Sequence, residues 1–222
     1  MKIAVLSDLH GKFIPVEEAE LMLICGDIFP LNIQTNINKG IEWLENDFMS
    51  WIEDQPINHV IFIAGNHDFI LEYSFVRSQM KFSNHVEYLH HHSTIYTARN
   101  NNEYHIFGTP YCKQFGNWAF MRNNDELKTK YNEIPENLDI LLTHDAPYLG
   151  GMGKILEIAS KENVGNPVLT NRIEEVRPKY TFCGHIHSGD HELIDYGYTI
   201  GANVSILNES YNIAYPPLYL EI

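Results

Sequence analysis

The chain has 222 residues, 44% of them hydrophobic, so it is long enough to bury a core, and its length is typical of one domain. Its 15 Lys and Arg residues are outnumbered by 29 Asp and Glu residues, which gives a formal net charge of −14 at pH 7. Such a charge repels the phosphate backbone of DNA and RNA, so a polynucleotide partner is disfavoured. We expect a single domain over residues 1–222.

Neither a secretory signal nor a membrane span is evident in the sequence. No basic segment followed by an apolar run opens the chain, and no apolar run approaches the roughly 20 residues that a bilayer requires. Cys25, Cys112 and Cys183 are widely spaced and form no CxxC pair, which predicts reduced thiols rather than disulfides or a zinc ribbon. We expect a cytoplasmic protein without a membrane partner. The sequence predicts no particular oligomeric state.

Apolar runs that end in polar loops recur along the chain. "MKIAVLSDLHG" starts with a β-type run and stops at a polar turn closed by Gly11, which predicts a buried strand followed by a functional loop. The runs over 21–25 and 60–64 end in Gly-Asp and Gly-Asn-His-Asp. "LDILLTHDAP" and "KYTFCGHIHSG" repeat the pattern later in the chain. Five predicted strands thus each lead into a loop rich in Asp, His, Asn or Gly.

Helical spacing separates some of these runs. Apolar residues in "GIEWLENDFMSWIEDQ", residues 40–55, recur on one helical face, and "VLTNRIEEV" predicts a second helix that ends near Pro178. Strands that alternate with helices predict an α/β fold, in which ligands bind at the carboxyl ends of the strands. The tail over 192–222 is rich in β-formers and predicts a second, partly antiparallel sheet.

The five predicted strand ends carry a concentration of metal-binding side chains. Asp8-Leu9-His10 and His185-Ile186-His187 each place two donors at i and i+2, which point the same way on an extended segment. Mixed carboxylate, amide and imidazole donors suit Mn²⁺, Fe or Zn²⁺ better than calcium. Alone, Asp8 would be typical of a turn and His144 of a buried, hydrogen-bonded histidine. Together the residues favour a metal site.

Five sequence blocks, in order, resemble the calcineurin-like metallophosphoesterase family. The blocks are "SDLHG", "CGDIF", "AGNHDF", "LLTHDAP" and "CGHIHSG", and the family pattern is D-x-H, G-D, G-N-H-[D/E], a later His and G-H-x-H. The match spans residues 8–187. The resemblance implies an α/β fold with four layers, an α/β/β/α sandwich of two mixed sheets flanked by helices.

The resemblance also implies two divalent metal ions, drawn from Mn, Fe, Zn, Co and Ni, with manganese a candidate. It implies that Asp27 bridges the two ions and offsets their repulsion. The remaining ligands are expected to be Asp8, His10 and His187 for one ion, and Asn66, His144 and His185 for the other.

The same resemblance implies catalytic roles for two neighbouring residues. His67 is similar to the family's catalytic histidine, which protonates the leaving oxygen while a hydroxide that bridges the metals attacks phosphorus. Asp68 is expected to hold the other ring nitrogen of His67. The expected activity is that of a phosphodiesterase or phosphatase acting on a small phosphoester. The alternatives are a nuclease of the same family and a non-catalytic scaffold protein that binds metal.

Further features allow two interpretations. Tyr111 and Trp118, in the aromatic segment 108–120, could bind substrate, although packing of a long loop is slightly favoured. This segment and "APYLGGMG" resemble a small metallophosphodiesterase branch that acts on cyclic nucleotides and model diesters. The "HHH" at 90–92 suggests metal binding, but a structural role is favoured. Cys25 and Cys183 are interpreted as apolar fillers rather than zinc ligands, and His191 as a surface residue.

Overall fold

Two mixed β-sheets form the centre of the protein. The computed structural model describes residues 1–155 and 162–222. The first sheet has the strand order β13 (Leu218–Glu221), β1 (Lys2–Leu6), β2 (Ala19–Cys25), β3 (Ile57–Ile63) and β4 (Val86–Tyr88). Strands β1 to β4 are parallel to one another, and the edge strand β13 is antiparallel to β1. The second sheet has the order β11 (Ile194–Asp195), β12 (Ile200–Asn203), β10 (Tyr180–Cys183), β9 (Ile140–Thr143), β6 (Glu103–Thr109) and β5 (His92–Thr97). β11 and β5 are its antiparallel edges.

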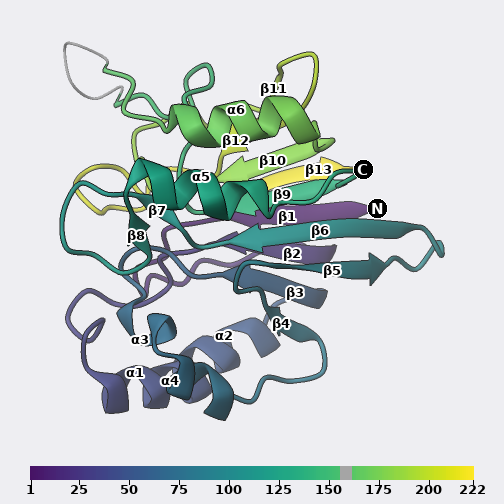
Figure 1. Cartoon of the computed structure of the whole chain (residues 1–222). Coiled ribbons are helices and arrows are strands. Elements are labelled where there is room, and N and C mark those ends of the chain that lie inside the picture. The colour runs from purple at the N-terminus through teal and green to yellow at the C-terminus, as the bar shows by residue number, and fades with distance from the viewer. Residues whose placement is uncertain (156–161) are drawn as a thin grey trace.

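Helices cover the outer face of each sheet (Figure 1). The first sheet is covered by α1 (Ile37–Trp43), the π-helical turn η1 (Leu44–Phe48), α2 (Met49–Glu53), α3 (Phe69–Glu72) and α4 (Ser74–Gln79). The second is covered by α5 (Asn124–Asn132) and α6 (Pro167–Val176), and a short pair of strands, β7 (Cys112–Lys113) and β8 (Met121–Arg122), lies beside it. This arrangement confirms the predicted four-layer α/β/β/α sandwich.

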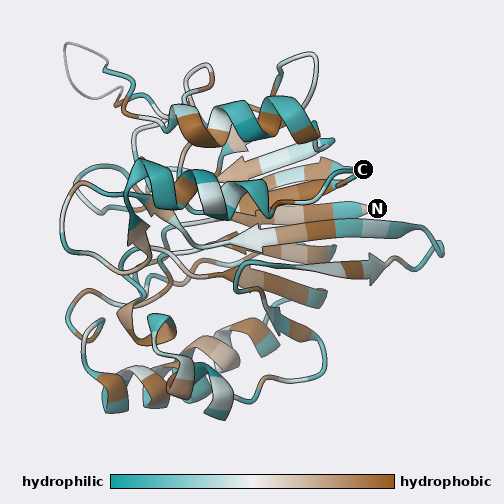
Figure 2. Cartoon of the chain, in the orientation of Figure 1, coloured by the Kyte–Doolittle hydropathy of each residue, from teal (hydrophilic) through white to brown (hydrophobic). Residues whose placement is uncertain are grey.

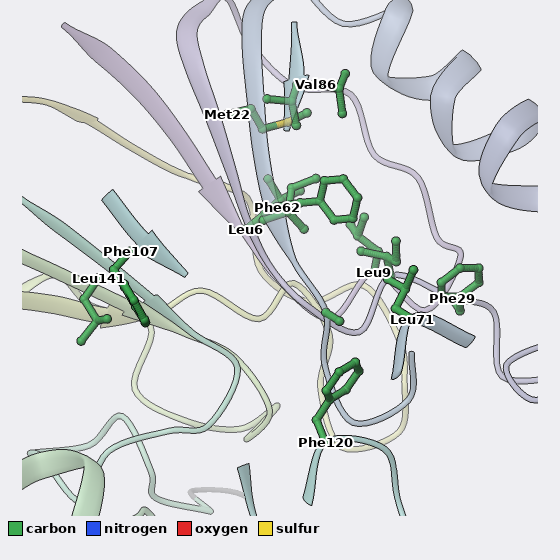
Figure 3. Packing of buried hydrophobic residues seen from close by; sticks show 14 of the residues in the cluster. Leu6, Leu9, Met22, Phe29, Phe62, Leu71, Val86, Phe107, Phe120 and Leu141 are labelled. Atoms are coloured by element: carbon green, nitrogen blue, oxygen red, sulfur yellow. The ribbon is translucent and has the colours of Figure 1, made fainter. Parts of the chain in front are cut away.

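Successive side chains of each central strand point to opposite faces of the sheet and so join two different buried clusters. Ile3 and Val5 of β1 pack between the sheets with residues such as Ile140, whereas Leu6 joins a cluster with Phe48 from the helical layer. A strand of a parallel sheet that is covered on both faces must be apolar at successive positions, as β1 and β2 are. Figure 2 shows the sheet interior as predominantly hydrophobic, and Figure 3 shows Leu6, Met22 and Phe62 packed beside the helices.

Both helices predicted from sequence are present, but α3, α4 and α5 were not predicted. The predicted helix over 40–55 spans 37–53 but contains the wider turn η1. Helix α5 was not predicted, although Asn123 and Glu126 form a capping box at its start, a signal readable in "NNDE". Helix α6 confirms the predicted second helix, and it begins with an Asn166 cap and a proline.

The β-rich tail is divided between the two sheets. β11 and β12 complete the second sheet, as predicted, but β13 pairs antiparallel with β1 of the first sheet. The expectation that the whole tail belongs to a second sheet is therefore wrong for β13. Pairing with β13 covers the free edge of β1, which would otherwise expose unpaired backbone groups. Over the described residues, no helix combines the length and apolarity that crossing a membrane demands.

Candidate metal centre

The carboxyl ends of β1, β2, β3, β9 and β10 place the predicted ligands at one end of the two sheets. Hydrogen bonds hold the first two loops together, because the Asp8 N–H donates to Gly26 O at 3.0 Å and the His10 N–H donates to Asp27 O at 2.9 Å. Asp8, His10 and Asp27 all have left-handed φ angles, of 58°, 43° and 52°. Such backbone costs about 1–2 kcal/mol per non-glycine residue, so its clustering marks a functional site.

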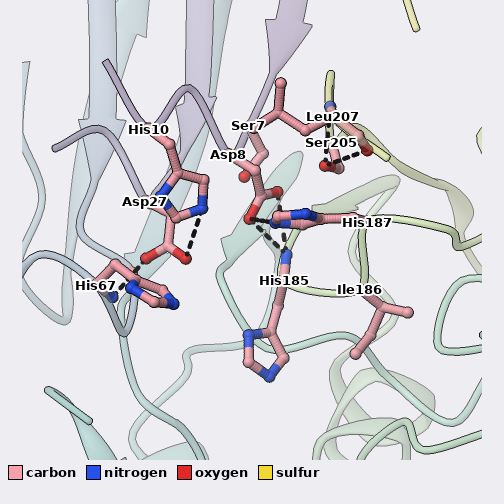
Figure 4. A network of polar contacts seen from close by, with 12 residues as sticks. Ser7, Asp8, His10, Asp27, His67, His185, Ile186, His187, Ser205 and Leu207 are labelled. Atoms are coloured by element: carbon pink, nitrogen blue, oxygen red, sulfur yellow. Dashed lines mark hydrogen bonds and ion pairs between the residues drawn. The ribbon is translucent and has the colours of Figure 1, made fainter. Parts of the chain in front are cut away.

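Asp8, His10 and His187 form one group of converging donors whose ligand atoms lie within 4.8 Å of one another. His187 Nε2 lies 3.4 Å from Asp8 Oδ1, and the His187 Nδ1–H donates to Asn208 O at 3.1 Å, which orients the ring (Figure 4). Burial opposes ionisation of Asp8, but the hydrogen bond and positive field of His187 lower its pKa to about 2. Both ring nitrogens of His10 are buried without a hydrogen-bond partner among the described residues. An orphaned imidazole beside a buried carboxylate fits a metal ligand.

Asp8, Asp27 and His144 form a second group. Asp27 Oδ2 lies 3.5 Å from His10 Nε2 and 3.3 Å from His144 Nε2, so this carboxylate stands between the histidines of the two groups, where a bridging ligand is expected. The Nδ1–H of His144 donates to Cys25 O at 2.9 Å, which turns Nε2 toward Asn66 Oδ1, 2.9 Å away. Burial opposes protonation of His144, but Asp27 and Asp8 raise its pKa to about 10.

His185 differs from the other predicted ligands. Its backbone N–H donates to both Asp8 oxygens at 3.1 Å, while its ring extends away from Asp8 (Figure 4). The ring centroid lies 5.1 Å from that of His144, on the side of the predicted second ion, but the ring belongs to neither group of converging donors. Burial lowers the pKa of His185 to about 3, so the imidazole is neutral and has a lone pair to offer. Its role as a ligand stays a prediction.

His67 is oriented by a residue that the sequence pattern did not indicate. The ring Nδ1 lies 2.7 Å from Gln34 Oε1, and because an amide oxygen only accepts, Nδ1 carries the proton. The His67 ring packs 4.9 Å from that of His10 and 4.4 Å from that of Trp118. Burial lowers the pKa of His67. The backbone N–H of His67 donates to Asp27 Oδ1 at 2.7 Å, so the residue is anchored to the metal centre through its backbone and to Gln34 through its ring.

Asp68 does not hold His67, so that prediction is wrong. Its carboxylate instead accepts the Phe29 N–H at 3.0 Å and the Gly65 N–H at 2.7 Å. Burial and the nearby Asp27 raise the pKa of Asp68 to about 8. Asp68 therefore connects the loops after β2 and β3 through hydrogen bonds. Gln34, from the segment before α1, is the residue that orients the His67 ring.

A cavity of about 160 Å³ opens above the ligands. Trp118 lines it, whereas Tyr111 is 9% exposed and packs in the core against His91 and Phe120. The structure thus separates the two predicted substrate contacts and removes Tyr111 from the site. Tyr211, which sequence reasoning missed, also lines the cavity, 5.0 Å from the His10 ring and 4.9 Å from the His187 ring. No motif surrounds Tyr211 in "NESYN", so only tertiary contact reveals it.

The other cysteines and histidines discussed from the sequence belong to neither group of converging donors. Cys25 and Cys183 are buried free thiols whose pKa is raised by burial, in agreement with a filler role. His91 contacts Thr109 Oγ1 at 3.0 Å and Glu133 Oε2 at 3.1 Å, which agrees with the structural interpretation of the "HHH" segment. The surface placement of His191 is wrong. Its ring is half-buried, stacks 3.6 Å from that of Tyr215, and donates from Nε2 to His187 O at 3.1 Å.

Comparison with known proteins identifies a relative in sequence and two solved structures that are similar in fold. The chain is 26% identical over 242 residues to metallophosphoesterase domain-containing protein 1 of Homo sapiens, covering 98% of this chain and 69% of the relative. The structure of TT1561 of Thermus thermophilus is similar in fold, with a TM-score of 0.60 at 13% identity over 91% of this chain and 88% of that one. The phosphopantetheinyl hydrolase of Mycobacterium tuberculosis gives a TM-score of 0.51 at 12% identity over 95% and 90%.

A family comparison agrees with the motifs, the fold and the grouped ligands. The family model described as calcineurin-like phosphoesterase matches residues 1–189, which contain every residue of the five sequence blocks. Proteins of this kind hydrolyse phosphoesters with divalent metals, and the Asp and His groups described above supply suitable ligands. The chain belongs to the calcineurin-like phosphoesterase family.

Proposed function

We propose that this protein is a dinuclear metal-dependent phosphodiesterase or phosphatase that acts on a small phosphoester. The observation that carries the proposal is the position of the Asp27 carboxylate between His10 and His144, beside the orphaned ring of His10. Divalent ions, when bound, supply Lewis acidity toward phosphoryl oxygens and acidify water at neutral pH. The proposed holders are Asp8, His10 and His187 on one side, Asn66, His144 and His185 on the other, and Asp27 between them.

His67 is the proposed proton donor to the leaving oxygen. It lines the cavity above the ligands, and its Nδ1–H is committed to Gln34. Donation to the leaving oxygen therefore requires the doubly protonated ring, whose Nε2–H would be the transferable proton, because a neutral ring that keeps its proton on Nδ1 could only accept at Nε2. Trp118 packs against the same ring and limits its rotation. Gln34 and Trp118 thus position His67, while Asp68 holds the loop from which it projects.

Charge favours a small substrate over a polynucleotide. The net charge is −14, and no Lys or Arg is among the described residues that line the 160 Å³ cavity. A nuclease requires a cationic track for the nucleic-acid backbone, so a nuclease is the second candidate, and retention on single-stranded DNA would favour it. A scaffold protein without catalysis is the third candidate, and it is contradicted by any metal-restored turnover.

The test is hydrolysis of bis-p-nitrophenyl phosphate and p-nitrophenyl phosphate by metal-stripped protein. Mn²⁺, Zn²⁺, Ni²⁺, Co²⁺ and Fe²⁺ are added back singly, and bound metal is measured by elemental analysis. We expect two ions per chain and metal-restored turnover, and an Asn66→Ala, His144→Ala double variant serves as a control for contaminating phosphatases. Two bound ions without turnover of either substrate would contradict the proposed activity, and an absence of bound metal would contradict the site.

A further inference from the structure

A second, larger cavity adjoins the metal centre. Its volume is about 390 Å³, against about 160 Å³ for the cavity above the ligands. The two cavities share Phe115 and His185 as a common wall. The larger one is also lined by Lys113, Ala146, Val164 and Ile186. A group bound there would therefore be continuous with a phosphoryl group held at the metal ligands.

The larger cavity is framed by a preformed network of hydrogen bonds. The buried Asp145 Oδ2 accepts from Lys113 N at 3.0 Å, from the Tyr131 hydroxyl at 3.1 Å and from Asn166 Nδ2 at 2.7 Å. These three donors belong to β7, to α5 and to the residue that caps α6. One carboxylate thus ties together three elements around the cavity, and its charge is compensated by the three donors. These hydrogen bonds connect the three elements without a ligand, as in the largely pre-formed cavities that bind small molecules.

The walls indicate what the cavity would hold. Phe115, Ala146, Val164 and Ile186 present mainly carbon, and the Phe115 ring, at the junction of the cavities, is 64% exposed. Lys113 is the one lysine or arginine among the residues that line either cavity in the described part of the chain. Asp145 also lines the larger cavity, but its Oδ2 is engaged by the three donors described above. An apolar wall with a single cation suits an apolar or aromatic group attached to an anion.

The position of His67 decides which part of the substrate enters this cavity. His67 and Trp118 line the smaller cavity but not the larger one, so the leaving oxygen lies toward them. The substituent toward Phe115 and His185 is then the one that stays on phosphorus. We propose that the larger cavity binds the retained ester group of a phosphodiester, and that this group is aromatic or apolar. This inference rests on the proposed function. A phosphomonoester has no such group and leaves the cavity empty.

Two diesters with the same leaving group test the proposal. Phenyl p-nitrophenyl phosphate and methyl p-nitrophenyl phosphate both release p-nitrophenolate and differ only in the retained group. For each diester, kcat/KM is divided by its rate of hydrolysis in alkali, which corrects for intrinsic reactivity. We expect the ratio of the corrected phenyl value to the corrected methyl value to be at least about 10, since pocket discrimination of apolar groups is about 10–200-fold. Val164→Trp should fill the cavity and reduce this ratio to below about 3.

Control variants separate filling of the cavity from unfolding. Ile95→Trp places the same ring on β5, at a residue that is 54% exposed and lines neither cavity, and should keep the wild-type ratio. If Val164→Trp does not fold, Phe115→Ala provides a second test. The Phe115 ring is largely exposed, so its removal should not unfold the protein, and it should reduce the phenyl preference at least about 3-fold. A wild-type ratio near 1, with both diesters turned over, would overturn the inference and leave the proposed function intact.

Binding provides a measurement that does not depend on turnover. Titration calorimetry of the metal-loaded protein compares phenylphosphonate with methylphosphonate. We expect the phenyl compound to bind at least about 10-fold more tightly and to lose this preference in Val164→Trp. Equal affinities in the wild-type protein would overturn the cavity assignment. Preferential binding without hydrolysis of any diester or of p-nitrophenyl phosphate would support the cavity and refute the proposed function.

Discussion

Gly65→Ala tests whether the two halves of the metal centre depend on close backbone approach. A Cβ atom at Gly65 would overlap Asp27 Oδ1 and lie only 2.5 Å from both the Asp27 backbone nitrogen and His144 Cε1. Real Cβ contacts are at least 3.0 Å, so Asp27 and His144 must each move by about half an ångström or more. The neighbours are buried, so overpacking should cost about 1–3 kcal/mol of unfolding free energy.

The displacement should affect activity more than stability. Asp27 stands between His10 and His144, and ligand geometry tolerates errors of only about 0.5 Å. We expect kcat/KM with bis-p-nitrophenyl phosphate to fall by about 100-fold, a typical loss for a misplacement of about 1 Å. Bound metal should also decrease, and urea unfolding measures the change in stability.

Gly201→Ala is the matched control for this substitution. Gly201 lies in β12, and its added Cβ would meet Thr181 O at 3.1 Å and two side-chain atoms of Met152 at 3.4 Å and 3.5 Å. Reduced freedom of the unfolded chain stabilises such a variant by about 0.4–1 kcal/mol, which offsets the one tight contact. We expect both its activity and its stability to stay near wild type. Metal content and kcat/KM within about 3-fold of wild type in Gly65→Ala would refute the geometric reasoning.

Three further predictions follow from particular contacts. His67→Gln should lower kcat by about 10²–10⁴-fold with metal content unchanged, and unaltered turnover would exclude proton donation by His67. Gln34→Ala should lower kcat more than it changes KM, because it frees the His67 ring, and partial recovery in Gln34→Glu would distinguish positioning from loss of structure. Although partial burial opposes it, the Lys179 ammonium, 2.6 Å away, together with the His105 N–H lowers the pKa of Asp139 below its unfolded value near 3.8. The wild-type protein should therefore be more stable than Asp139→Asn at pH 6, and this advantage should be lost as the pH falls below about 4. Urea unfolding of both proteins at pH 6 and below pH 4 measures it, and an equal difference in unfolding free energy at the two pH values would contradict the prediction.

The strand-to-loop junctions and the location of the site could be predicted from sequence because both depend on local signals, whereas the order of the strands within each sheet came only from the structure. Each predicted ligand follows a buried apolar run within a few residues, and such runs in an α/β fold deliver their carboxyl ends to one edge. Asp8, Asp27 and His144 could thus be grouped although 136 positions separate Asp8 from His144. Asp8 and His10 do converge, but their left-handed φ angles of 58° and 43° show that the segment is not extended, so the two-residue period of a strand is not the cause.

Contacts between segments without a shared motif were decided by tertiary structure alone. Gln34 reaches His67, and Tyr211 closes the cavity, but neither residue lies in a periodic or conspicuous stretch. The family resemblance assigned Asp68 to the ring of His67, yet the Asp68 carboxylate accepts from backbone N–H groups on two loops. Buried backbone donors need such an acceptor. Tyr111 shows the same limit, since an aromatic ring in a glycine-containing loop suits a core and a binding site equally well. Sequence thus determines which chemical groups reach the end of the sheets, and the packing of loops from distant parts of the chain determines which atoms those groups face.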